Sequence, residues 1–193
     1  MTRKRKIRST LALALLLGLT AEATAAPVFF HGAIGCPWLN YPSSIQSSVD
    51  ANKQNSTSSN YRLDTTLGVF IPVSWEKTLG GLIINWTYDK FSLEQQSSQT
   101  SQFTFGPSLM RFYGPTPGAG LFWKTDIGLA LAHASTSSAV TSLTSKPGIG
   151  LLAGVGYSFA ARNARLLIKT EYAARLIEMK LYRTIVLGLG LLL

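Results

Sequence analysis

Residues 61–75, YRLDTTLGVFIPVSW, alternate between two kinds of side chain with a period of two. The odd positions are apolar or aromatic apart from one threonine, whereas the even positions are mostly polar or small. Successive side chains of a β-strand point to opposite faces, so this period predicts a strand with one apolar face. A helix would repeat its apolar positions every three to four residues instead.

The same alternation recurs along the chain and predicts an all-β protein. It is clear in LIINWTYDKF (82–91), LFWKTDIGLALAH (121–133), IGLLAGVGYSF (149–159), RLLIKTEYAARL (165–176) and TIVLGLGLLL (184–193). Each run is about as long as the ~9–11 residues that cross a bilayer when tilted. A fourth strand at 103–114 and a first strand at 28–35 bring the count to eight. We expect Pro37 to interrupt the first strand, because proline cannot donate to a ladder.

The links between these strands alternate in length. Short links, EKT (76–78), GPTPG (114–118) and ARNA (161–164), separate longer polar ones at 43–60, 92–101 and 135–146, with a shorter one near 178–180. This order is typical of an up-and-down barrel that has loops at one rim and turns at the other. The sequence therefore predicts an eight-stranded antiparallel transmembrane β-barrel.

The N-terminus predicts export. MTRKRKIR is basic, LALALLLGL is apolar, and Ala23-Thr24-Ala25 has the small-x-small pattern of a cleavage site, which together are typical of a secretory signal peptide. We expect residues 1–25 to be the signal peptide and 26–193 to be the barrel domain. A retained membrane anchor is the alternative, disfavoured because the apolar run is short.

The charge content separates a membrane barrel from a soluble one. The leader holds five of the 18 basic and one of the nine acidic residues, which leaves 21 charges in 168 residues. Soluble domains carry charge at about 25% of positions. We therefore expect the apolar face to meet lipid and the polar face to fill a narrow lumen, which eight strands leave just wide enough for side chains. No nucleic-acid partner is expected, because much of the high pI belongs to the leader.

Aromatic residues on the apolar face fall into two bands. One band lies next to the short turns and the other next to the long loops, as aromatic girdles at two interfaces would. A random scatter from β-propensity alone is the alternative. The expected girdle residues are Trp75, Tyr113, Trp123 and Phe159 beside the turns, and Tyr61, Tyr88 and Phe103 beside the loops.

Charged side chains on the opposite parity are expected to point into the lumen. The predicted network comprises Lys124, Asp126, Lys169 and Glu171 in the lower to middle barrel, and Arg62, Asp64 and Asp89 nearer the loop rim. Opposite charges held together are tolerated in such an interior, whereas an unpaired charge is costly. The alternative is a water-filled path in which these charges confer ion selectivity.

The chain resembles small bacterial outer-membrane β-barrel proteins of the opacity type. The resemblance rests on FTFGPSLMRFYG (103–114), on GIGLLAGVGYSF (148–159) and on the terminal Gly188-x-x-Leu191-x-Leu193. It implies an integral outer-membrane protein in contact with outer-membrane lipids and lipopolysaccharide. The terminal motif is similar to the signal read by the barrel-assembly machinery, but it ends in leucine rather than phenylalanine or tryptophan.

An enzymatic role is the third reading, after a structural or surface-interaction (adhesion-like) role and a narrow channel. His133-Ala134-Ser135 resembles the His-x-Ser pair of lipid A 3-O-deacylases, but neighbouring strands offer no carboxylate near that rim to orient the base. We expect no catalytic residue, cofactor or metal site. The Ser-, Thr- and Gln-rich loops are expected to be solvated links or, alternatively, to bind an extracellular ligand that the sequence does not identify.

Overall fold

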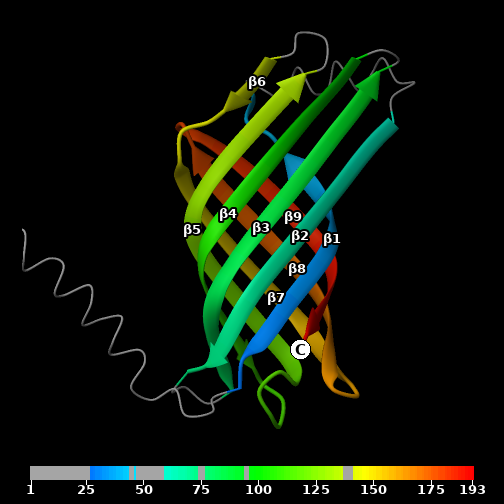
Figure 1. Ribbon diagram of the computed structural model, residues 1–193, viewed down its shortest axis with the longest axis vertical. Coiled ribbons are helices and arrows are strands. Elements are labelled where there is room, and N and C mark those ends of the chain that lie inside the picture. Colours follow the sequence, from blue (N-terminus) through cyan, green and yellow to red (C-terminus); the bar gives the residue numbers. More distant parts are fainter. Residues whose placement is uncertain (1–26, 44–45, 47–58, 74–76, 94–95, 137–140) are drawn as a thin grey trace, which may run out of the picture.

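Eight antiparallel strands close into a barrel in the computed structural model, which describes residues 27–43, 46, 59–73, 77–93, 96–136 and 141–193 (Figure 1). The barrel strands are β1 (Phe29–Asn40), β2 (Ser59–Pro72), β3 (Thr78–Leu93), β4 (Gln96–Phe112), β5 (Gly120–Thr136), β7 (Gly148–Ala161), β8 (Ala164–Ile177) and β9 (Lys180–Leu192). A ninth, short strand, β6 (Thr141–Thr144), pairs with the loop end of β5 only. The predicted fold class, an eight-stranded antiparallel barrel, is confirmed.

Closure joins the first strand to the last. β1 pairs with β9 from His31↔Leu192 to Asn40↔Arg183, and the ends of the ladder continue in hydrogen bonds between Phe30 and Leu193. The apolar C-terminal run is therefore the closing strand, as its alternation predicts. The predicted signal peptide and its cleavage site lie outside the described residues.

The first strand is longer than predicted. β1 continues through Pro37 to Asn40, so the expectation that proline interrupts this strand is wrong. The ladder with β2 stops at Gly35↔Asp64, whereas the ladder with β9 runs on past Pro37↔Val186. Pro37 thus lies where β1 is paired on one side only, and a strand edge tolerates its missing donor.

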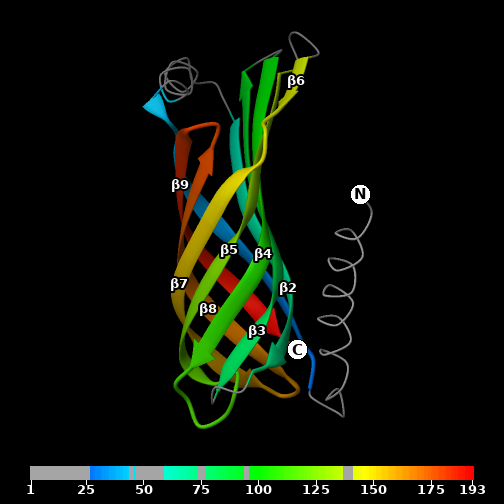
Figure 2. The ribbon, with the colours of Figure 1, turned by 90° about the vertical axis from the view of Figure 1, so that its left-hand side faces the viewer.

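Two of the predicted long loops are largely strand. β3 and β4 pair as far as Leu93↔Gln96, so most of 92–101 forms a hairpin, and β5 and β6 pair from His133↔Thr144 to Thr136↔Thr141. These hairpins rise above the rest of the rim (Figure 2). The sequence did not reveal them because both of their faces are polar, so the period of two disappears. Most of the 43–60 link lies outside the described residues.

The lumen is layered along the barrel axis. Near the turns, a buried apolar cluster of Phe70, Leu79, Ile83, Met110, Phe112, Phe122, Leu167 and Leu192 fills the interior. Near the loops, a second cluster of Tyr41, Phe91, Ala130, Ala132, Ile177 and Tyr182 does the same. Between the two clusters lie buried charged side chains, among them Lys169, Glu171 and Arg175 of β8. The outward positions of the strands are predominantly exposed apolar residues, so the barrel is polar inside and apolar outside.

Among the described residues, no helix is long and apolar enough to cross a membrane.

Candidate functional site

An ionic quartet occupies the lower part of the polar layer. Lys124 Nζ contacts Asp126 Oδ2 on the same strand and lies 3.1 Å from Glu171 Oε2, and Lys169 Nζ lies 3.0 Å from the same Glu171 oxygen. Ser108 Oγ donates a further hydrogen bond to Asp126. The four charged side chains are at most 3% exposed. The structure therefore brings together, as two cations and two anions, the four central residues that the sequence places in the lumen.

Glycines on β7 lie opposite the charged residues of β8, and a Cβ added at Gly154 would meet Glu171. In the ladder between these strands, Gly154 pairs with Glu171, Gly150 with Arg175 and Gly156 with Lys169. On its other side Gly154 pairs with Lys124 of β5, so the Lys124–Glu171 contact passes over a position without a side chain. Gly154 thus leaves room for the contact between the charged side chains of β5 and β8.

Arg175 forms a second centre that depends on neutral partners. Its guanidinium, fully buried, donates to Thr104 Oγ1 at 2.9 Å, Thr87 Oγ1 at 3.1 Å and Gln102 Oε1 at 3.2 Å, and it also donates to Asn85 Oδ1. A longer contact of 3.5 Å reaches Thr184 on β9. Partners from β3, β4 and β9 therefore hold one cation of β8 across the lumen.

Asp64 balances Arg175 through shared partners. Asn85 Nδ2 donates to Asp64 Oδ1 at 3.0 Å, and Thr87 Oγ1 donates to Asp64 Oδ2 at 2.7 Å. The same two side chains accept from Arg175, so the carboxylate and the guanidinium are linked by one intervening residue on each path. The sequence grouped Asp64 with the rim charges, whereas its hydrogen bonds join it to the Arg175 centre.

A third group lies at the loop rim. Arg62 Nε lies 3.1 Å from Asp89 Oδ1, and the Arg62 guanidinium lies 5.8 Å from the centre of the Phe91 ring. Tyr41, just beyond the end of β1, donates to Asp89 Oδ2 at 2.7 Å. Burial and the Asp89 carboxylate raise the pKa of the Tyr41 phenol, so this group stays a donor. Arg62 is 24% exposed, which makes this the wettest of the three groups.

Charge is balanced within each group. The quartet has two charges of each sign, Arg175 faces Asp64, and Arg62 faces Asp89. Buried charges are stable only when they are paired and hydrogen-bonded. In the described part of the chain, the buried side-chain atoms without a hydrogen-bond partner are both ring nitrogens of His31, Arg62 Nη2 and Glu171 Oε1. The paired groups therefore link side chains of several strands across the lumen.

The expected girdle residues that the structure describes point outward or lie partly exposed. Tyr113 and Phe159 are exposed beside the turns, with Trp123 half-buried, and Tyr61 is exposed beside the loops, with Tyr88 and Phe103 half-buried. Trp75 lies outside the described residues. The loop-side aromatics form a row through Trp86, which stacks on Phe103 at 6.0 Å and meets Tyr88 at 5.7 Å edge to face. Trp86 was absent from the predicted girdle, although its parity placed it on the same face.

His133 and Ser135 lie on β5 at the base of the β5–β6 hairpin. The His133 ring hydrogen-bonds the Thr144 hydroxyl across that hairpin at 2.9 Å. Neither residue belongs to the lumen groups described above.

Residues that sequence analysis missed are those whose role depends on a neighbour in space. Arg175 has the inward parity of β8, and that signal was available. Asn85, Thr87, Gln102 and Thr104 are neutral, and nothing in their local sequence marks them as ligands of a buried cation. Tyr41 follows a strand whose end was placed too early.

Comparison with solved structures identifies the same fold elsewhere. Neisserial surface protein A matches with a TM-score of 0.57 at 14% sequence identity, over 88% of this chain and 98% of that one. The attachment invasion locus protein Ail of Yersinia pestis, in complex with the heparin analogue sucrose octasulfate, matches with a TM-score of 0.51 at 12% identity, over 86% and 99%. No protein-family model matches the sequence, and no curated protein is similar to it in sequence. The chain thus has the fold of small outer-membrane β-barrel proteins.

Proposed function

We propose that this chain is an integral outer-membrane barrel with a closed lumen and a structural or surface-interaction role. The inverted polarity of the barrel carries the proposal. Lys124 and Glu171 are 1% exposed, whereas Ile34 is 61% and Leu129 is 62% exposed. Soluble monomers rarely expose apolar patches of more than a few hundred Å². A wall made of such residues is stable where lipid covers it, and the pairing of β1 with β9 closes the barrel.

The lumen favours a closed barrel over the channel alternative. Two apolar clusters lie above and below the polar layer, and the charges between them are paired with one another. An ion would have to break those pairs and pass both clusters. A conducting pore instead needs charged or carbonyl groups that face water.

The tall hairpins support a surface-interaction role. β3, β4, β5 and β6 extend one side of the rim, and their tips are rich in serine, threonine and glutamine. This wall can offer hydroxyl and amide groups to a partner outside the cell. Ail, of the same fold, is an attachment invasion protein whose structure holds a heparin analogue.

The proposed membrane partners follow from the outer wall and from the ends of the strands. Outward Lys90 and Arg183 lie near the loop ends of β3 and β9, where they can meet the phosphates of lipopolysaccharide. The C-terminal strand, ending at Leu193, is the segment that we propose the barrel-assembly machinery reads. We propose no enzymatic role, since the described partner of His133 is a threonine hydroxyl.

Membrane fractionation, gel mobility and cysteine labelling test this proposal. The protein should fractionate with the outer membrane and require detergent for extraction, and it should migrate faster on gels before boiling than after. In a Cys36→Ser background, Ser142→Cys on β6 should react with an impermeant maleimide on intact cells, whereas Thr116→Cys in the β4–β5 turn should not. Equal labelling of the two cysteines would refute the topology, and a protein soluble without detergent would refute the membrane location.

A further inference from the structure

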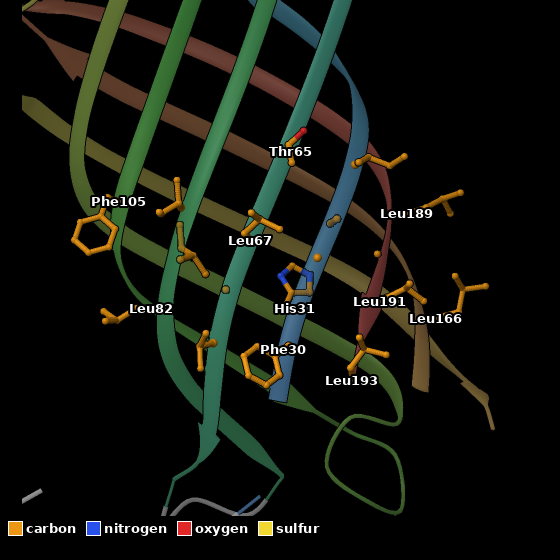
Figure 3. Close-up of a pocket in the computed structure, with 18 residues that line it drawn as sticks. Phe30, His31, Thr65, Leu67, Leu82, Phe105, Leu166, Leu189, Leu191 and Leu193 are labelled. Carbon is orange, nitrogen blue, oxygen red and sulfur yellow. The ribbon is translucent and has the colours of Figure 1, made fainter. Parts of the chain in front are cut away.

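An apolar groove of about 940 Å³ opens on the outer wall in the turn half of the barrel (Figure 3). It runs over β8, β9, β1, β2, β3 and β4, and Phe30, Leu67, Leu191 and Leu193 lie around it. It is distinct from the lumen groups, because its lining is built mainly from the outward side chains of these strands.

The groove arises because one position in a row of large side chains is a glycine. The strand registers place Phe105, Ile84, Leu67, Gly32, Leu191 and Leu166 side by side on six neighbouring strands. At Gly32 the row has no side chain, so the leucines on either side form the walls of a slot one residue wide.

Packing of the backbone does not require a glycine at position 32. A Cβ added there would meet a single atom within 4 Å, Leu67 Cδ2 at 3.9 Å. By contrast, a Cβ at Gly81 would lie 2.0 Å from the Val69 carbonyl oxygen, and one at Gly106 would lie 2.1 Å from that of Ile127. Gly81 and Gly106 are required by close backbone approach, whereas Gly32 leaves open a space that a larger residue would fill.

Basic side chains lie at the turn ends of strands that line the groove, although none of them lines the groove itself. The described charged residues at the turn ends are Lys77, Arg111, Arg162 and Arg165, all basic, whereas the described acidic residues lie in the lumen or at the loop end; Glu76 lies outside the described residues. Arg162 precedes Leu166 by four positions and Lys77 precedes Leu82 by five, which corresponds to about 13–17 Å of strand. One leaflet of hydrocarbon is about 15 Å thick, half of the ~30 Å core.

We propose that the Gly32 slot binds an acyl chain of a phospholipid from the leaflet at the turn end, with its phosphate among the basic side chains at the turn ends of the strands around the slot. An apolar slot within about one leaflet's thickness of basic turn ends complements a lipid that has an apolar chain and an anionic head. The inference rests on the proposed membrane location, because only a barrel in the membrane meets such lipids.

Native mass spectrometry of the detergent-purified barrel tests the site, with palmitoyl-oleoyl phosphatidylglycerol as the probe. The wild type should bind one tightly held lipid, and Gly32→Phe should weaken that binding about tenfold or more, because the ring displaces at least about two methylene groups of the chain. Ala153→Phe is the matched control, since Ala153 is also outward and exposed but lies on β7, away from the groove. Leu67→Trp, which narrows the same slot from β2, decides the result if Gly32→Phe does not fold.

The same experiment distinguishes binding of the lipid headgroup from binding of the acyl chain, and a lipid in the slot from a second copy of the chain. Arg111→Gln with Arg162→Gln should weaken phosphatidylglycerol but leave a diacylglycerol of the same chains unchanged. Equal lipid binding by the wild type and Gly32→Phe, or a wild-type dimer that Gly32→Phe abolishes, would overturn the acyl-chain site. Because this experiment uses purified protein, its failure leaves the membrane location to the fractionation test.

Discussion

The quartet and the Arg175 centre stabilise buried charges in different ways. In the quartet, Glu171 contacts two lysines directly, and Lys124 contacts Asp126 two positions along its own strand. Arg175 instead reaches its balancing carboxylate, Asp64, through the side chains of Asn85 and Thr87. The quartet depends on charge, whereas the Arg175 centre depends on the geometry of neutral groups around a planar cation.

Removing Glu171 should have the largest effect. Glu171→Ala leaves Lys169 without its ion pair and Lys124 with one partner, both buried, and breaking a buried pair costs about 3–5 kcal/mol. The free energy of unfolding, measured with urea in lipid vesicles, should fall by that amount.

The double variant Lys169→Gln with Glu171→Gln is the control. It restores neutrality, so its loss should be smaller than the sum of the two single losses by about 1–3 kcal/mol. Strict additivity of the two would show that charge pairing does not hold this part of the lumen.

Arg175→Lys should cost less than Glu171→Ala but more than a charge-conserving change elsewhere. Lysine keeps the charge but cannot reach the acceptors on three strands at once, and unpartnered buried acceptors cost about 1–3 kcal/mol. Unfolding in urea should show a loss of about 2–3 kcal/mol. If Arg175→Lys is as stable as the wild type, charge alone suffices and the contrast between the two centres disappears.

A side chain at Gly154 should disturb the quartet without disturbing the Arg175 centre. A Cβ at Gly154 would lie 3.0 Å from the Thr170 carbonyl oxygen and 3.4 Å from Glu171 Cβ, so Gly154→Val should push Glu171 from Lys124 and cost about 1–3 kcal/mol. Ala153→Val, one residue away on the outer face, is the matched control and should be close to neutral. The two variants would be compared by the temperature at which the detergent-solubilised barrel loses its gel shift. Equal temperatures would argue that Gly154 does not make room for the Lys124–Glu171 contact.

The Arg62–Asp89 pair at the rim should contribute least to the free energy of unfolding. Arg62 is partly exposed, and ion pairs that water reaches contribute about 0–1 kcal/mol. Arg62→Gln should therefore change the free energy of unfolding by less than about 1 kcal/mol. A loss as large as that of Glu171→Ala would mean that the rim is as dry as the quartet.

Parity in the sequence predicted which residues of each strand face inward, because one face had to be apolar. It also grouped the quartet, since Lys124 with Asp126 and Lys169 with Glu171 stand two residues apart on the same face. It could not predict the Arg175 centre, whose partners are neutral and come from three other strands. Nor could it predict the apolar clusters that close the lumen, because Phe70, Phe122 and Leu167 break the alternation. The hairpins above the rim were missed where both strand faces are polar.

Ion conductance in planar bilayers tests the closed, neutral lumen most directly. The wild-type barrel should give no steady single-channel current, and neither should the Lys169→Gln, Glu171→Gln double variant, because the apolar clusters at both ends stay in place. A steady wild-type current whose ion selectivity changes in Glu171→Gln would contradict the account and show that these charges line an open pore.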